Sequence, residues 1–201
     1  HNIAVLIKTL AMENNKNHLK EGKFLCIRRS NDVSQVKSFV PSPEVGAHTD
    51  EAMGTHHARD VYHLYKTLDM DLNVFSSALK LNTQYMHSIW YDLKIDKKIT
   101  KEKAIQKLID NPRVSVTQKK AANLVFSFGR DHGHYGRILN QTVAVLPSVH
   151  VKNENEIFGF CFTPQDGNSI LSSITQTVRF MYPEEHEEKL KALGPFLLQE
   201  V

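Results

Sequence analysis

Strand-like and helix-like segments alternate irregularly along the 201 residues of this chain, with no repeat period and no repeated βαβ unit. Apolar or alternating segments predict strands at 23–29, 72–81, 86–94, 114–118, 143–147 and 156–162. In 86–94 we expect His87, Ile89, Tyr91 and Leu93 to share one face, and we expect 143–147 and 156–162 to form an antiparallel pair. Apolar residues at helical spacing predict helices at 3–10, 60–68, 100–109, 121–128, 170–181 and 183–193, with Thr100 as the N-cap of the third. This order favours an α+β fold, in which a mixed, largely antiparallel sheet has helices packed on one face.

Composition narrows the class of protein to which the chain can belong. Its hydrophobic fraction of 41% is enough for a core, and we expect residues 1–201 to form one domain. No apolar run approaches the roughly 18 residues that cross a bilayer, so we expect no membrane partner. The net charge is only +3 and the basic residues are scattered, which argues against a nucleic-acid partner. Cys26 and Cys161 lie in apolar stretches, which is typical of buried free thiols in a reducing cytoplasm.

Two regions carry further expectations. The chain begins at His1 without an initiator methionine or a secretory signal, so we expect natural sequence upstream. Residues 30–55 lack periodicity and contain Pro41, Pro43 and Gly46, which predicts a long irregular loop of the kind that is often functional.

No GxGxxG motif follows a strand, so we expect no cofactor to be bound by this chain alone.

The segment 54–60, GTHHARD, can be a metal site, a phosphate site or a solvated loop. Zinc needs about four ligands in tetrahedral geometry, and adjacent His56 and His57 cannot easily point at one ion. Arg59 would also repel a cation, so we expect no metal, although a His-rich zinc protein stays open as an alternative. The segment 129–136 predicts a glycine-containing loop with two solvated polar residues, His132 and His134.

An anion site suits the same cluster better. Arginine offers a planar fork of donors that matches phosphate oxygens, and histidine can add one or two hydrogen bonds. Arg28 and Arg29 end a predicted strand, which is a rigid place from which to present such a fork. Together with His56 and His57 they predict a phosphate site on which both pairs converge. The alternative is that the arginines are ordinary surface charges and the histidines belong to a solvated loop.

The order of these motifs resembles the C-terminal catalytic domain of the archaeal-type (type II) phosphorylating glyceraldehyde-3-phosphate dehydrogenase. The resemblance covers nearly the whole chain, with matching spacing up to about residue 130. In that family a strand ending in Ile-Arg-Arg precedes a His-His loop, a Met-His strand and a helix that follows a threonine. The corresponding segments here are Ile27-Arg28-Arg29, THHARDV at 55–61, YMHSIWYDLK at 85–94, TKEKAIQKLIDNPRV at 100–114 and FGRD at 128–131.

The resemblance implies a fold, a reaction and a set of roles. It implies the fold of that family's C-terminal domain, a cytoplasmic homo-oligomer, and oxidation of glyceraldehyde 3-phosphate with NAD or NADP and inorganic phosphate. It places His87 as the catalytic acid–base residue, whereas the residues alone also allow a hydrogen-bonded histidine on a core-facing strand. The positions implied to bind substrate and phosphate are Asn2, Arg28, Arg29, His56 and His57.

The chain also departs from the family's pattern. His1 stands where the family has its cysteine nucleophile, and Ile3-Ala4-Val5 replaces a Thr-Thr-Gly turn. The family's N-terminal dinucleotide-binding domain is not within these residues. We therefore expect the catalytic-domain portion of a divergent glyceraldehyde-3-phosphate dehydrogenase that is inactive as this isolated chain. The alternative is a non-catalytic relative that retains the fold as a phosphate-binding or protein-interaction module.

Overall fold

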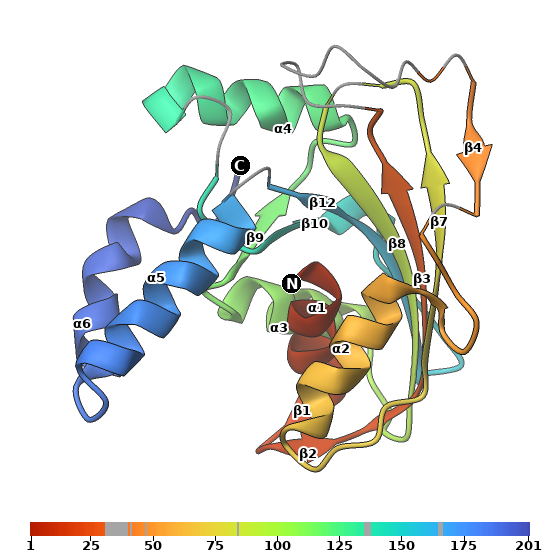
Figure 1. Ribbon diagram of the computed structural model, residues 1–201, viewed down its shortest axis with the longest axis horizontal. Coiled ribbons are helices and arrows are strands. Elements are labelled where there is room, and N and C mark those ends of the chain that lie inside the picture. Colours follow the sequence, from red (N-terminus) through yellow and green to blue (C-terminus); the bar gives the residue numbers. More distant parts are fainter. Residues whose placement is uncertain (31–39, 41, 47, 84, 135–137, 165–166) are drawn as a thin grey trace.

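A computed structural model describes residues 1–30, 40, 42–46, 48–83, 85–134, 138–164 and 167–201 (Figure 1). Within these residues the main sheet has the strand order β4-β7-β3-β8-β12-β10-β9, and β11 pairs with β12. Its strands are β3 (Leu19–Arg28), β4 (Glu44–Val45), β7 (Val74–Lys80), β8 (His87–Ile95), β9 (Val114–Thr117), β10 (Thr142–Val145), β11 (His150–Lys152) and β12 (Glu156–Thr163). Two small hairpins are β1 (Met12–Glu13) with β2 (Lys16–Asn17), and β5 (Thr49–Asp50) with β6 (Gly54–Thr55).

The sheet is mixed, as the sequence predicts. The pairs β3–β7 and β9–β10 are parallel, and the other pairs are antiparallel, including the predicted pair β10–β12. Each parallel pair is joined through a helix, so the sheet contains two strand–helix–strand crossovers that the irregular sequence pattern does not predict. The expected α+β fold is confirmed.

Three helices cover one face of the sheet. Figure 1 shows α1, α2 and α3 together within its curve, with α4 above and α5 and α6 to the left. The helices are α1 (Asn2–Ala11), α2 (His56–Lys66), α3 (Lys101–Asp110), α4 (Ala122–Gly129), α5 (Gly167–Met181) and α6 (His186–Leu190). As expected, Thr100 caps α3 by accepting a hydrogen bond from the N–H of Lys103 at 3.2 Å. No helix among the described residues is long and apolar enough to cross a bilayer.

The core forms where α1 packs on β3 and β8. Leu6 and Ile7 of α1 and Tyr91 and Leu93 of β8 are fully buried. The predicted alternation of β8 is confirmed, because Ile89, Tyr91 and Leu93 share its buried face with the half-buried His87. Each fully buried apolar side chain contributes about 1.5–3 kcal/mol, so α1 is held firmly at the centre of the domain.

Two expectations about loops are wrong. The segment 54–60 is not a loop, because Thr55 caps α2 and the helix already begins at His56. The segment 129–136 continues α4 as a π-helix, Arg130–His134, as far as the structure describes it.

In 30–55 the described residues include the short strands β4 and β5, whereas 31–39, 41 and 47 lie outside them. The predicted helix at 183–193 begins only at His186 and is followed by a 3-10 segment, Lys191–Phe196.

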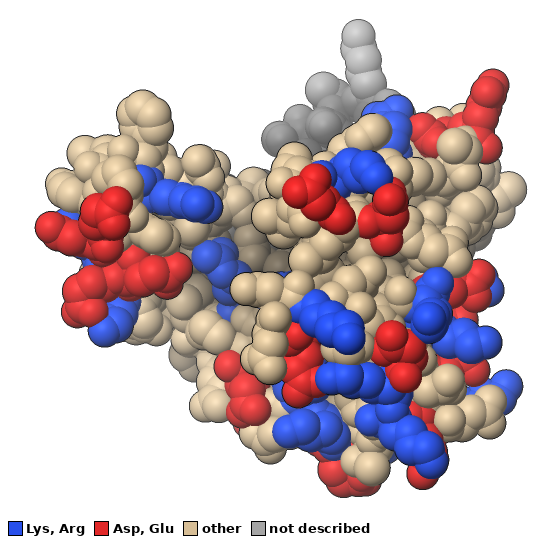
Figure 2. All heavy atoms as spheres, turned by 90° about the horizontal axis from the view of Figure 1, so that it is seen from below, with Lys and Arg blue, Asp and Glu red and all other residues tan. Residues whose placement is uncertain are grey.

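The charged surface is mixed in sign. Figure 2 shows the face seen from below, where lysines and arginines are interspersed with acidic side chains. Among the described residues, exposed ion pairs include Lys97 with Glu13 at 2.6 Å and Lys98 with Glu154 at 2.7 Å. Exposed pairs of this kind contribute only about 0–1 kcal/mol each to stability.

Candidate functional site

A pocket of about 580 Å³ opens at the N-terminal end of α1. It is lined from α1, β3, α2, β8, β12 and α5 by His1, Asn2, Ile3, Ala4, Cys26, Arg28, His57, Asp60, Val61, Leu64, His87, Ser88, Ile89, Thr163 and Ser169. The structure therefore brings together five of the predicted site residues, namely His1, Asn2, Arg28, His57 and His87. Arg29 and His56 are not among the residues that line this pocket.

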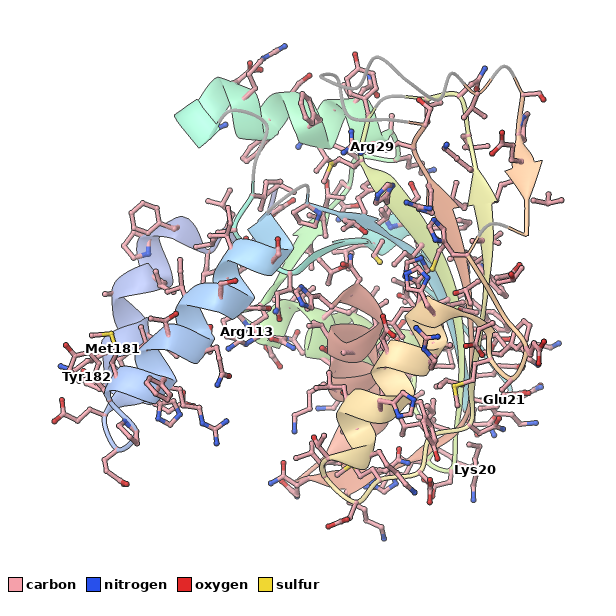
Figure 3. The ribbon with its side chains drawn as sticks, viewed as in Figure 1. Lys20, Glu21, Arg29, Arg113, Met181 and Tyr182 are labelled. Atoms are coloured by element: carbon pink, nitrogen blue, oxygen red, sulfur yellow. The ribbon has the colours of Figure 1, made fainter. Side chains whose placement is uncertain are left out.

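Arg28 is the last residue of β3 and Arg29 follows it, and the two arginines do not line the same pockets. Arg28 lines the large pocket. Arg29 lines a smaller pocket of about 220 Å³, and Figure 3 shows it beside α4. The two pockets share Arg28 and Ser88 as a common wall. Arg28 and His57 therefore line the same pocket, whereas Arg29 lines the neighbouring one.

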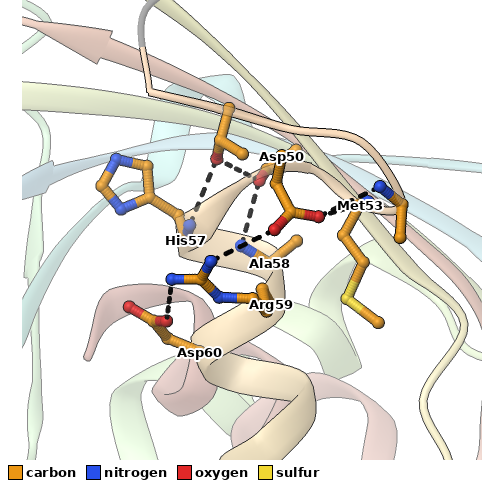
Figure 4. Close-up of polar contacts among 9 residues, drawn as sticks. Asp50, Met53, His57, Ala58, Arg59 and Asp60 are labelled. Atoms are coloured by element: carbon orange, nitrogen blue, oxygen red, sulfur yellow. Dashed lines mark hydrogen bonds and ion pairs between the residues drawn. The ribbon is translucent and has the colours of Figure 1, made fainter.

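The first turn of α2 is held by side chains of neighbouring elements (Figure 4). Thr55 Oγ1 accepts a hydrogen bond from the N–H of His57 at 3.2 Å, and Ser76 Oγ accepts one from the N–H of Ala58 at 3.0 Å. The first amide of the helix donates to the carbonyl oxygen of His48 at 3.3 Å. Helix N-termini commonly bind anions through free amides, but these three amides are already bonded. An anion at this end of α2 must therefore be bound by side chains.

Three histidines gather at the same end of α2. The ring centroids of His48 and His56 lie 4.9 Å apart, and those of His56 and His57 lie 4.1 Å apart. The part of the chain that the structure describes nevertheless has no group of three or more potential ligands arranged to hold a metal ion. The zinc alternative therefore finds no support among the described residues.

His57 is the member of this group that lines the pocket. Burial, followed by the proximity of His56 and Arg28, lowers the pKa of His57 from 6.5 to about 4. Its ring is therefore neutral at pH 7. Its Nε2 is buried and has no hydrogen-bond partner among the described residues. A buried polar atom without a partner is costly, which makes His57 a candidate for contact with a ligand.

Arg59 is turned away from the pocket, although it lies in the same sequence cluster. Its guanidinium pairs with Asp50 at 3.3 Å and with Asp60 at 3.4 Å (Figure 4). The side chain is 49% exposed, so these are surface ion pairs of small energetic value. Arg59 therefore does not line the pocket, but it pairs with Asp60, a carboxylate that does.

His87 lines the pocket, and it is also hydrogen-bonded, as one of the two interpretations left open by the sequence expects. Its Nδ1 accepts a hydrogen bond from the peptide N–H of Arg29 at 3.0 Å. Burial, followed by the charges of Arg29 and Arg28, lowers the pKa of His87 from 6.5 to about 4. The ring is therefore neutral at pH 7.

The start of α1 forms another wall of the pocket. His1 is exposed, stands at the N-cap position and makes no side-chain capping hydrogen bond. Asn2 is only 4% exposed, and its amide nitrogen donates to Thr142 Oγ1 at 3.0 Å and to the carbonyl oxygen of Phe162 at 3.5 Å. Asn2 thus ties the helix to β10 and β12, and the positive end of the α1 dipole faces the pocket.

Both cysteines are buried free thiols, as the sequence predicts. Cys26 also lines the pocket, which its apolar surroundings in the sequence do not reveal. Burial, followed by the proximity of Cys161, raises the pKa of Cys26 to about 12. Since the thiolate is the nucleophilic form, Cys26 is a poor nucleophile at neutral pH.

The sequence also fails to identify several residues of the site. His48, Ser88, Thr163 and Ser169 have no motif of their own, and only the fold brings them to the pocket or to the histidine group. Ser88 adjoins His87, which is the only signal that could have pointed to it.

Comparison with known proteins shows a distant relationship. No protein-family model matches the chain. A glyceraldehyde-3-phosphate dehydrogenase of Sulfolobus acidocaldarius is 27% identical over 167 residues, which cover 78% of this chain and 45% of that protein. One of Saccharolobus islandicus is 25% identical over 166 residues, with the same coverage. The chain thus spans less than half the length of these relatives. It is distantly similar to archaeal glyceraldehyde-3-phosphate dehydrogenases, and its mixed α+β fold is consistent with their catalytic domain.

Proposed function

We propose that this chain is the catalytic-domain portion of a divergent glyceraldehyde-3-phosphate dehydrogenase and binds a phosphate-bearing ligand, such as glyceraldehyde 3-phosphate, in the large pocket. We propose further that the chain by itself does not oxidise this ligand. The observation that carries the proposal is the convergence of Arg28, His57 and His87 on one pocket from three separate elements.

The chemistry of the pocket favours an anion. Arg28 supplies a permanent charge and a fork of donors that fits phosphate oxygens. His57 and His87 are neutral at pH 7 and add ring nitrogens without adding charge. The N-terminal end of α1 contributes a further positive potential. A charge-assisted hydrogen bond contributes about 1.5–3 kcal/mol, so Arg28 should dominate the affinity.

The described residues do not supply the oxidation chemistry. His1 stands where the resembled family has its cysteine, and an imidazole has no sulfur atom with which to form the thiohemiacetal that this chemistry needs. Cys26 lines the pocket, but its pKa of about 12 keeps it protonated.

The described residues also do not fit a dinucleotide. They contain no glycine-rich turn between a strand and a helix, and the first amides of α2 are already bonded. A nicotinamide cofactor would have to be bound by residues other than these.

A titration tests the binding proposal. Inorganic phosphate and glyceraldehyde 3-phosphate are titrated separately into the ¹⁵N-labelled protein at pH 7.5, and amide shifts are followed by NMR. Arg28→Ala should weaken binding by about ten-fold or more, because it removes a charge-assisted hydrogen bond. Arg130→Ala is the matched control, since Arg130 is paired with Asp131 at the surface and lines neither pocket. Equal affinities of the two variants would contradict the proposal.

An activity assay tests the second half. The purified chain is mixed with glyceraldehyde 3-phosphate, inorganic phosphate and either NAD or NADP, and cofactor reduction is followed by absorbance. The expected rate is that of a heat-treated control. Turnover above that control would show that the chain contains a nucleophile and a cofactor site that the proposal does not recognise.

A non-catalytic interaction module is the second candidate. The end of α5 favours it, because Phe180 is 84% exposed and Met181 is 60% exposed. Figure 3 shows Met181 and Tyr182 at the end of α5 that lies away from the sheet. A homo-oligomer that covers this surface would be dissociated by Phe180→Asp. Light scattering after size-exclusion chromatography measures this, and a wild-type monomer at all concentrations would remove this candidate.

A further inference from the structure

The contact between Arg29 and His87 fixes where the imidazole can carry its proton. A peptide N–H is only a donor, and the N–H of Arg29 points at Nδ1 of His87 at 3.0 Å. Nδ1 must therefore present its lone pair to Arg29. In a neutral imidazole the single proton then resides on Nε2.

The alternative protonation states conflict with the surroundings of His87. An Nδ1–H tautomer would set two N–H groups against each other at hydrogen-bond distance. An imidazolium would do the same, and it would also place a third positive charge beside Arg28 and Arg29 at a half-buried position. The low pKa of His87 agrees with this geometry.

The remaining ring nitrogen is available to a ligand. His87 lines the large pocket, and its Nε2 has no hydrogen-bond partner among the described residues. Nε2 of His57 is buried without a partner among these residues, whereas Nε2 of His87 is not fully buried. The open nitrogen of His87 is therefore the one that carries the proton.

We infer that the peptide N–H of Arg29 locks His87 in the Nε2–H tautomer, so that His87 is a fixed hydrogen-bond donor to an acceptor oxygen of the ligand and not a base that removes a proton. Arg29 is thus a positioning residue that acts through its main chain. The ligand group at this point is a phosphate or carbonyl oxygen, and a hydroxyl or ammonium that must donate is disfavoured. The identity of the ligand rests on the proposed function, whereas the tautomer does not.

The tautomer is measured directly, without any ligand. Long-range ¹H–¹⁵N correlation spectra of protein labelled in its histidine rings distinguish a protonated from an unprotonated ring nitrogen. The His87 signals are assigned by their loss in His87→Gln. We expect the Nε2–H pattern, unchanged between about pH 6 and pH 8, because the pKa lies well below this range. An Nδ1–H pattern, or a titration in this range, would overturn the inference.

Two variants then separate a donor from a base. In His87→Gln the amide nitrogen reaches approximately the position of Nε2, so a donor to the pocket is retained. In His87→Asn the shorter amide can satisfy only the N–H of Arg29. If His87 is a donor, Gln should bind glyceraldehyde 3-phosphate within about three-fold of wild type and Asn about ten-fold more weakly, as expected for one neutral hydrogen bond. Equal loss in both variants, or no loss in either, would overturn the inference.

The choice of probe distinguishes the two kinds of oxygen. Weaker binding of both inorganic phosphate and glyceraldehyde 3-phosphate by His87→Asn assigns the donor to a phosphate oxygen. Weaker binding of glyceraldehyde 3-phosphate, with unchanged binding of inorganic phosphate, assigns the donor to the carbonyl oxygen. If the wild-type protein binds neither probe, the proposed function fails while the tautomer measurement still decides the role of Arg29.

Discussion

Cys26 and Cys161 lie on either side of Ile89, each directly opposite it in the ladder of the sheet. Cys26 of β3 and Cys161 of β12 are both register partners of Ile89 on β8. Two strand spacings separate their Cα atoms by roughly 9–10 Å, which exceeds the reach of a disulfide. The two thiols therefore share a face of the sheet without being able to join.

The first prediction follows from this arrangement. Both thiols should be unreactive in the folded protein at pH 7.5, because the pKa of Cys26 is raised to about 12 and that of Cys161 to about 11. Alkylation followed by mass spectrometry should modify neither cysteine within the time that labels both in denaturant. An intramolecular disulfide under mild oxidation, or rapid labelling of Cys26, would contradict this prediction.

The second prediction concerns a close approach between β12 and β8. A Cβ at Gly159 would lie 2.6 Å from Cζ of Tyr91, whose ring is fully buried and cannot move aside. Gly159→Ala should therefore destabilise the fold by about 1–3 kcal/mol, the usual cost of overpacking. Gly194→Ala is the control, because no atom lies within 4 Å of its Cβ. Equal unfolding midpoints in urea would refute the proposed contact.

The third prediction separates two helix caps. Thr55→Ala removes the cap of α2 and its hydrogen bond with Ser76 Oγ, so it should cost about 1–2 kcal/mol of unfolding free energy. It should also weaken phosphate binding, because the capped turn positions His57. Thr100→Ala removes the cap of α3, which is not part of the pocket, and should lower stability without changing the affinity. Denaturation and phosphate titration of both variants measure the difference.

The fourth prediction is a loss of stability in mild acid. The pKa of His87 is about 4 in the folded protein and 6.5 as its ordinary value, so between these pH values only the unfolded chain takes up the proton. Stability should therefore be complete above about pH 6.5 and fall as the pH drops towards 4, by about 2–3 kcal/mol for this group. His87→Gln should flatten this dependence in urea unfolding, whereas His132→Gln, at an exposed position, should retain it. An unchanged pH profile in His87→Gln would argue against a buried neutral ring.

The sequence predicts best where one local pattern decides the structure. The alternation along β8 and the Thr100 cap of α3 are each specified by neighbouring residues, and both are confirmed. The pairing of β3 with β7 is decided instead by residues about fifty positions apart, across a helix, and no local pattern reveals it.

The site follows the same division. The resemblance named Arg28, His57 and His87, and the fold brings all three to one pocket. It treated Arg28 and Arg29 as a pair, but only Arg28 lines the large pocket, whereas both line the smaller one. His48 joins His56 and His57 only through the folding of a segment that the sequence shows as irregular.

Because the amides at the start of α2 are bonded within the protein, the atoms that stabilise this helix are different from the side-chain atoms that face the pocket. Thr55, Ser76 and the carbonyl oxygen of His48 maintain the helix, while Arg28, His57 and His87 face the pocket. A cradle made of backbone amides cannot be altered by substitution without disturbing its loop, but side chains can be exchanged one at a time. The ligand preference of this pocket is therefore open to change by single substitutions, in evolution or in the laboratory, while the fold that presents them stays in place.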